Sequence, residues 1–307
     1  MNTFSTTLSP LPPYDFNISI HSHRNKRYHY DQYDRSGSVY KCAIELRDQP
    51  ALITVSDKGT PKEPRLKLSI SGNHVTKTDM KKVKSVVGKQ FLLDFDLKKF
   101  YSGIKHDSVM RGITKKFYGL KPNSSGDLFE CITRCIMSQQ ISVHVADKVE
   151  MEFVRKFGSS IKSGDEIFYV FPTARRVAEL SKSDLRSVKF SERKAEYLID
   201  LARLVANGEV DLNAMEKLPN DEFRAEITKI RGIGHWTAEC CLMHLGRWEI
   251  FPRGDLGLHQ AVRLFYGFKK KIGEKEVVKI ARQWAGWESL ATYYLWHALT
   301  HARANGQ

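Results

Sequence analysis

The hydrophobic and polar positions divide the chain into two parts of different texture. Residues 16–71 contain short apolar runs separated by polar turns, a pattern typical of strands. The four runs are FNISI, SVYKCAIEL, ALITVS and RLKLSI. Residues 76–116 show helical spacing with many lysines, with one further short strand expected at 91–93, and helical spacing dominates from 128 onward. The pattern predicts an α+β fold in which a sheet precedes a series of helices.

One polar segment marks the expected boundary between these parts. The segment KPNSSGD at 121–127 is rich in residues that favour loops. We therefore expect a basic α+β domain over residues 1–120 and an all-helical domain over residues 121–307. Three helical segments of the second domain, TARRVAEL, SKSDLRSV and SERKAEYLIDLARLVANG, begin with Ser or Thr, and the last ends in Asn207-Gly208, as is typical of helix caps.

Charge is unevenly distributed along the 307 residues, which carry 49 Lys+Arg and 35 Asp+Glu. Residues 58–121 contain 16 basic and 5 acidic side chains, whereas residues 126–307 contain 27 and 24. Most of the basic excess is therefore N-terminal. A polyanion such as nucleic acid would attract it, because Lys and Arg displace counterions from phosphates. A solvated, solubilising face explains the same excess, and charge alone does not separate the two.

Composition also bears on location. No apolar run approaches the 18 or so residues of a membrane-spanning helix, and the start of the chain lacks the pattern of a secretory signal. Five cysteines, an odd number, fit a reducing compartment better than a disulfide framework. We expect an intracellular protein, in a cytoplasm with its nucleoid or in a nucleus, with no membrane association.

Two glycines lie in a turn between two segments of helical periodicity. The turn is Ile230-Arg231-Gly232-Ile233-Gly234, between EFRAEITK and HWTAECCLMHL. Glycine tolerates positive φ and lets a ligand approach the backbone closely. The first amides of the second helix stay unpaired at a positive dipole end, which suits an anion such as a DNA phosphate. An ordinary glycine turn between two helices is the structural alternative.

An acidic residue stands at the start of the next helix. The segment FPRGDLGL places Asp255 about 20 residues after the turn, where an Asp in isolation is usually a helix cap. Taken together, IRGIGHWTAE and FPRGDLGL resemble the helix-hairpin-helix DNA glycosylases. The pattern of that superfamily, HhH-GPD, runs roughly LPGIGxWTA and, some twenty residues later, FPxxDLGL.

The resemblance extends over most of the chain, strongly over 126–305 and in texture and a few positions over 10–120. CITRCIMSQQISVHVADKV resembles the first long helical stretch of the family with its Gln-bearing loop. LRSVKFSERKAEYLIDLARLVANGEVDL resembles a later conserved segment, and LPPYDF resembles the N-terminal strand of the 3-methyladenine DNA glycosylase II branch. That branch implies an antiparallel β-sheet domain with helices, followed by an all-α helix-hairpin-helix glycosylase domain.

The resemblance implies that a damaged nucleotide is flipped out of double-stranded DNA, because its glycosidic bond is unreachable in the stack. Asp255 would be the catalytic residue, its carboxylate stabilising positive charge on the sugar or orienting the attacking water. Bifunctional members carry a nucleophilic Lys where this chain has Trp236, so we predict a monofunctional hydrolase. Trp287 matches a pocket Trp of the alkyl-purine branch and Trp236 is a second pocket candidate, although core packing also explains aromatic residues at helical spacing.

The resemblance also assigns DNA contacts to the turn and to the Gln-bearing loop. Gln140 is the candidate for insertion into the gap left by the flipped base, and Gln139 is the second candidate. Arg231 stands where the family usually has Pro. This replacement makes the turn less rigid and adds a positive charge near the expected phosphate. The expected DNA-binding residues are Arg231, Gly232, Ile233, Gly234, His235, Thr237, Gln139 and Gln140. The backbone carbonyls that match a monovalent cation site are those of Thr228, Ile230 and Ile233.

We expect no iron–sulfur cluster and no other cofactor. The cysteines are spaced unlike those of the iron–sulfur branch, and buried core thiols explain Cys131, Cys135, Cys240 and Cys241. His297 and His301 are four residues apart, but no third zinc ligand is evident.

The predicted function is a monofunctional DNA glycosylase, acting as a monomer on alkylated (3-methyladenine-type) or otherwise damaged purines and initiating base excision repair. One alternative is a non-catalytic helix-hairpin-helix protein that binds damaged DNA, which has no need of Asp255 at this spacing. The other is an oxidised-purine glycosylase with lyase activity, against which Trp236 argues.

Overall fold

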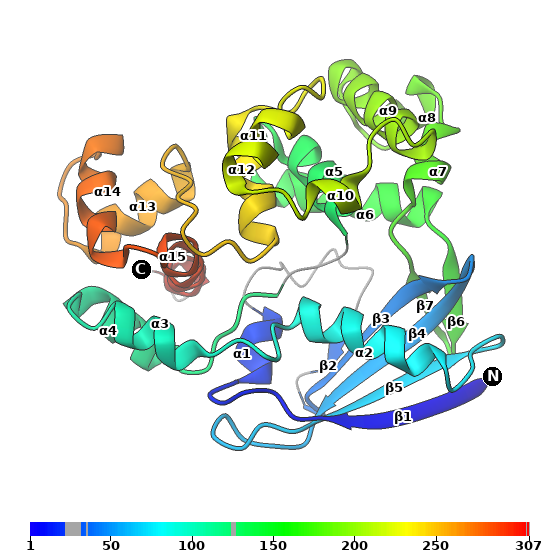
Figure 1. The fold of residues 1–307 in the computed structure, drawn as a ribbon, viewed down its shortest axis with the longest axis horizontal. Helices are drawn as coiled ribbons and strands as arrows, with labels where there is room; N and C mark the ends of the chain where they lie inside the picture. The colour runs from blue at the N-terminus through cyan, green and yellow to red at the C-terminus, as the bar shows by residue number, and fades with distance from the viewer. Residues whose placement is uncertain (22–31, 35, 124–126, 305, 307) are drawn as a thin grey trace.

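The computed structural model describes residues 1–21, 32–34, 36–123, 127–304 and 306. Its N-terminal part is a five-stranded antiparallel sheet in the order β1-β5-β4-β3-β2 (Figure 1). Alternate side chains of β5, including Leu66, Leu68 and Ile70, are buried, whereas Lys67 is exposed. Helix α2 buries Val83 and Val87 in the same core. The strands are β1 (Asn2–Leu8), β2 (Gln32–Asp34), β3 (Val39–Leu46), β4 (Gln49–Asp57) and β5 (Leu66–Gly72), and α2 is Asp79–Gln90.

Three local expectations about this part were wrong. FNISI belongs to helix α1 (Phe16–His21), because Asp15 caps it through Ile18 N–H at 3.0 Å, and Phe16 and Ile20 are buried one turn apart. LPPYDF is not the N-terminal strand, which is β1; it connects β1 to α1. Residues 91–93 form a turn that follows α2.

The segment after residue 127 is predominantly helical, and its buried residues belong mainly to two cores, one reaching from Leu128 to Ile250 and the other including Leu258 to Leu299. Its first half holds α5 (Leu128–Ser138), α6 (Val143–Phe157), α7 (Ala174–Ala178), α8 (Lys182–Ser187), α9 (Glu192–Ala206) and α10 (Leu212–Met215). Its second half holds α11 (Asn220–Ile227), α12 (His235–His244), α13 (Leu256–Phe265), α14 (Glu274–Ala281), a 3-10 turn at Arg282–Trp284 and α15 (Glu288–Ala304). In the described part of the chain, no helix combines the length and apolar character needed to cross a membrane.

A short hairpin interrupts this helical series, where only helices were expected. Strands β6 (Ser160–Ser163) and β7 (Glu166–Tyr169) pair with each other and contact β4 and β3. Ile161 and Phe168 share a small core with Ala43 and Leu52 of the sheet. The hairpin therefore joins the helical part to the sheet.

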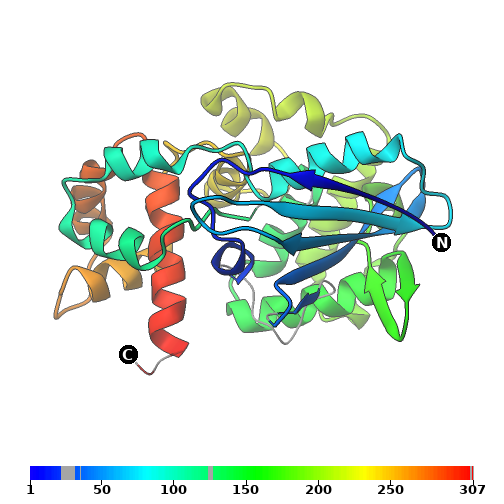
Figure 2. The same cartoon turned by 90° about the horizontal axis from the view of Figure 1, so that it is seen from below.

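Helices α3 (Leu97–Gly103) and α4 (Ser108–Lys116) precede the expected boundary at residue 120 but pack on the C-terminal helices. Phe100 and Met110 share a core with Leu258 and Tyr294. Figures 1 and 2 show both helices beside α15. The sheet and the C-terminal helices are thus connected by α3 and α4, which position α13 and α15 and their side chains.

The expected linker at 121–127 begins with a buried anchor. Lys121 is fully buried, and its Nζ donates to the carbonyl oxygens of Leu92 and Leu93 at 3.0 and 3.1 Å. Burial lowers the pKa of Lys121 to about 8. Residues 124–126 of the expected linker lie outside the described residues.

Candidate active site

Asp255 occupies the N-cap of α13, as the sequence predicts. Its Oδ1 accepts the backbone N–H of Leu258 at 2.7 Å and the indole N–H of Trp296 at 3.0 Å. Oδ2 accepts no hydrogen bond from the described residues. The carboxylate is half-buried, so one oxygen is held by two donors while the other is available to a ligand.

The segment before Asp255 is fixed by its own backbone. The N–H of Asp255 donates to the carbonyl of Pro252 at 2.8 Å, and the N–H of Arg253 donates to that of Phe251 at 2.8 Å. Pro252 is buried. These contacts set the direction in which the Asp255 side chain leaves the chain, before the helix begins at Leu256.

Trp296 is the aromatic residue that the structure brings to Asp255, and the sequence analysis did not single it out. It lies on α15 and makes an edge-on contact with Tyr293, with ring centroids 5.5 Å apart. A Cβ at Gly257 would lie 3.2 Å from Trp296 Nε1 and 3.1 Å from Asp255 Oδ1. Gly257, the glycine of DLGL, thus leaves room for the contact between Trp296 and Asp255. It is the one feature of the sequence that indicates a side chain packed closely against Asp255.

The predicted turn joins α11 to α12. Gly232 has φ +88°, and a Cβ there would lie 2.3 Å from the ring of Tyr197, so no other residue fits without rearrangement. Gly234 is the N-cap of α12 and, having no side chain, it leaves the first amides of the helix without a side-chain partner. Thr237 is buried behind them, whereas His235 is exposed. The anion site at these amides stays a prediction.

Arg231 is engaged by acidic residues of α9. Its guanidinium lies 2.8 Å from Glu196 and 3.1 Å from Asp200, and it stacks over Tyr197 at 5.2 Å. The hydrogen bond to Glu196 raises the pKa of Arg231. The side chain is exposed, but two carboxylates already compensate the positive charge that replaces the usual Pro.

The two glutamines after α5 differ in their contacts. Gln139 is half-buried and donates through Nε2 to the carbonyl of Gly232 at 3.0 Å, so it ties its loop to the turn. Gln140 is exposed and has φ +58°. Lys194, which the sequence analysis did not select, donates to the carbonyls of Met137 and Gln139 at 2.7 Å each. The loop and the turn form one connected surface, from which Gln140 projects.

The two predicted pocket tryptophans lie in different surroundings. Trp236 is 38% exposed, in the first turn of α12. Trp287 packs against Phe95 and Phe100, with centroids 6.3 and 5.9 Å away, and a Cβ at Gly103 would lie 2.4 Å from its Nε1. Trp287 is thus part of the aromatic packing between α3 and the C-terminal helices, and Trp296 is the indole that contacts Asp255.

The expected cation carbonyls lie around the same turn. Ile230 and Ile233 are buried and Thr228 is exposed, and the carbonyl of Ile230 accepts the N–H of Ile233 at 3.1 Å. A carbonyl oxygen has a second lone pair, so this bond is compatible with a cation there. The monovalent cation stays a prediction.

Together, the glycine turn between α11 and α12 and the acid at the start of α13 define a helix-hairpin-helix protein with a carboxylate at the start of the helix that follows the hairpin. The family model of the HhH-GPD superfamily of base excision DNA repair proteins matches residues 133–286. The DNA-3-methyladenine glycosylase of Bacillus subtilis (strain 168) is 37% identical over 210 residues, which are 68% of this chain and 69% of the relative. The chain belongs to the HhH-GPD superfamily, and the predicted resemblance is confirmed.

Solved structures show the same fold. The 3-methyladenine DNA glycosylase from Archaeoglobus fulgidus superposes with a TM-score of 0.84 at 24% identity, covering 96% of this chain and 98% of that one. The 8-oxoguanine glycosylase/lyase of Clostridium acetobutylicum, in complex with double-stranded DNA, superposes with a TM-score of 0.74 at 18% identity, covering 98% and 99%. The α+β architecture, with a sheet domain before the helices, is therefore confirmed.

Proposed function

We propose that this protein is a monofunctional DNA glycosylase that hydrolyses the N-glycosidic bond of alkylated purines, of the 3-methyladenine type, in double-stranded DNA. It acts as a monomer and performs the first step of base excision repair. The observation that carries this proposal is the carboxylate of Asp255, fixed through Oδ1 and open at Oδ2, one helix after the hairpin.

The reaction separates the base from C1′ of the sugar, and water supplies the hydroxyl that replaces it. An N-alkylated purine already carries positive charge, so it leaves with the bonding electrons as a neutral base and needs no proton donor. Positive charge then develops on the sugar, where the open Oδ2 of Asp255 stabilises it electrostatically and orients the water. The hydrogen bond from Trp296 keeps the carboxylate in this orientation.

The assignment as a hydrolase without lyase activity rests on the first turn of α12. Trp236 occupies the position of the nucleophilic Lys in bifunctional relatives, and an indole cannot form a Schiff base. Lys229, at the other end of the hairpin, is paired with Glu226 at 2.7 Å. The fold itself does not discriminate, because the Clostridium acetobutylicum glycosylase/lyase shares it. Borohydride should therefore trap no covalent protein–DNA complex.

DNA binding is assigned to the surface formed by the hairpin and the Gln-bearing loop. The free amides at the start of α12 bind a phosphate, and the backbone around Gly232 and Gly234 allows close approach. Gln140, exposed on the loop that Gln139 and Lys194 hold in place, enters the gap left by the flipped base.

The test is release of methylated bases from alkylated duplex DNA by the wild type and by Asp255→Asn, with alkali to reveal abasic sites. Asn is also a good N-cap and its Oδ1 can accept both hydrogen bonds, so the fold is retained. We expect the variant to lose about 100-fold or more in rate while binding DNA. Equal excision by both proteins would refute the role of Asp255. A wild type that binds damaged DNA without releasing any base would support the non-catalytic alternative.

A further inference from the structure

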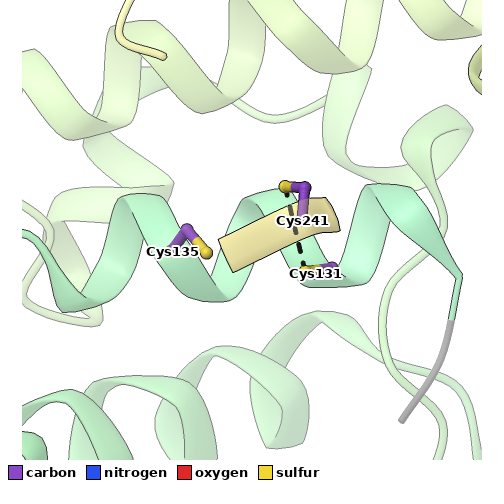
Figure 3. Close-up of side chains that lie close together, drawn as sticks. All are labelled: Cys131, Cys135 and Cys241. Carbon is purple, nitrogen blue, oxygen red and sulfur yellow. Dashed lines mark hydrogen bonds between the residues drawn. The ribbon is translucent and has the colours of Figure 1, made fainter. Parts of the chain in front are cut away.

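Three of the five cysteines gather between α5 and α12 (Figure 3). Cys131 and Cys135 lie one turn apart on α5, and Cys241 faces them from α12. The three sulfur atoms all lie within 4.8 Å of one another, and those of Cys131 and Cys241 are 3.9 Å apart. All three residues are buried. Cys240, the residue next to Cys241 on α12, is half-buried.

This spacing matches a metal–thiolate site. A tetrahedral zinc ion bound at about 2.3 Å by sulfur places its ligand atoms about 3.8 Å apart. The Cys131–Cys241 separation already has this value, and the remaining sulfurs need to approach by less than about 1 Å, within reach of small side-chain rotations. Two ligands one turn apart on a helix are a common element of zinc sites.

The three buried thiols come from two different helices. A cysteine that only fills space in a core has no need of other thiols close by. Cys42, in the core of the sheet, is such a residue. The convergence of three thiols from two helices indicates a shared ligand.

We propose that Cys131, Cys135 and Cys241 bind a zinc ion. Soft thiolates select zinc among the divalent metals available to a protein. This proposal is an alternative to the interpretation of these residues as buried core thiols, which the sequence favours. It does not depend on the glycosylase activity, because it is defined by metal binding.

The site has a structural consequence for the surface proposed to bind DNA. Helix α5 leads directly into the Gln-bearing loop, and α12 begins at the hairpin. An ion bound to both helices fixes the position of Gln139 relative to Gly232, which are already joined by a hydrogen bond. Zinc should therefore raise the melting temperature and tighten the coupling between loop and hairpin.

The experiment titrates cobalt(II) into the full-length protein after purification under reducing conditions and treatment with a chelator. We expect one equivalent to bind with sulfur-to-cobalt charge-transfer absorption and the intense visible bands of tetrahedral cobalt, both abolished by zinc. Cys131→Ser and Cys241→Ser should each weaken cobalt binding by at least about tenfold. Loss of a residue that only hydrogen-bonds to a metal ligand already lowers metal affinity by that factor. Cys42→Ser is the matched control and should bind as the wild type does.

X-ray absorption of the zinc-loaded wild type keeps the proposal testable if a serine variant fails to fold. Sulfur neighbours at about 2.3 Å are expected. The proposal is overturned if the wild type shows no thiolate charge transfer, if zinc has only nitrogen or oxygen neighbours, or if folded Cys131→Ser binds cobalt unchanged.

Discussion

The hydrogen bond from Trp296 to Asp255 can be removed while an aromatic ring is kept at the same place. Trp296→Phe deletes the indole N–H that lies 3.0 Å from Oδ1 and leaves the N–H of Leu258 at 2.7 Å as the remaining donor. A hydrogen bond to a charged group contributes about 1.5–3 kcal/mol. Without this hydrogen bond, the side chain of Asp255 populates other rotamers. The fraction of molecules with the carboxylate in the reactive orientation then falls by about 10- to 150-fold, because about 1.4 kcal/mol corresponds to a factor of ten.

The assay is single-turnover release of methylated base from duplex DNA with enzyme in excess, because it separates the chemical step from product release. Trp284→Phe is the matched control, since its indole N–H donates to a different carboxylate, that of Asp107, at 2.9 Å. The control should lower the melting temperature and leave the rate constant unchanged below the melting transition. A Trp296→Phe rate within twofold of the wild type, or equal losses in both variants, would refute the positioning role.

Three further predictions concern the hairpin, the buried lysine and the basic N-terminal part. Gly232→Ala should destabilise the protein by about 1–3 kcal/mol because of its positive φ and the contact with Tyr197, whereas Gly234→Ala, whose Cβ meets nothing within 4 Å, should be nearly neutral in thermal melts. Because burial lowers the pKa of Lys121 to about 8, the unfolded chain binds more protons between about pH 8 and 10.5. The free energy of unfolding should therefore gain a contribution that rises with pH in that window, and Lys121→Met should remove this slope in denaturant titrations. Charge reversal on α2 should weaken DNA binding at low salt in fluorescence titrations. An unchanged affinity would indicate that these lysines form a solvated face and do not contribute to DNA binding. The residues to reverse are Lys81, Lys82 and Lys84, all exposed.

The hydrophobic period and the composition were sufficient to predict the helices and strands that have a long or strongly alternating pattern. Strands β3, β4 and β5 and the main helices follow the predicted runs. The five residues FNISI fit the hydrophobic period of a strand as well as that of a helix. The hydrogen bond that Asp15 accepts from the N–H of Ile18 stabilises the helix. Strands β6 and β7 have four residues each, too few for a period, and their burial depends on contacts with β3 and β4. Such contacts belong to the tertiary structure and leave little trace in local sequence.

The candidate site divides in the same way. The turn at the hairpin glycines and the helix start at Asp255 could be predicted because the local backbone restricts the residue type there, whereas the functional roles of these residues were implied by the resemblance to the helix-hairpin-helix DNA glycosylases. Trp296 could not, because α15 brings it to Asp255 from 41 residues away. Its neighbour along the helix, Tyr293, has the same aromatic character, so residue type alone did not distinguish a core position from one that touches the carboxylate.

The proposed binding surface predicts two separate contributions to DNA affinity. At the hairpin, the charge of Arg231 is compensated by Glu196 and Asp200, so we expect binding there to depend on backbone amides, which displace few counterions. The basic excess lies in residues 58–121. Reversal of the α2 lysines should therefore reduce the slope of log affinity against log salt, whereas disruption of the hairpin at Gly232 should lower affinity at every salt concentration and leave the slope nearly unchanged. If the hairpin variant changed the slope as much as the lysine variant, side-chain charge rather than backbone amides would dominate binding at the turn.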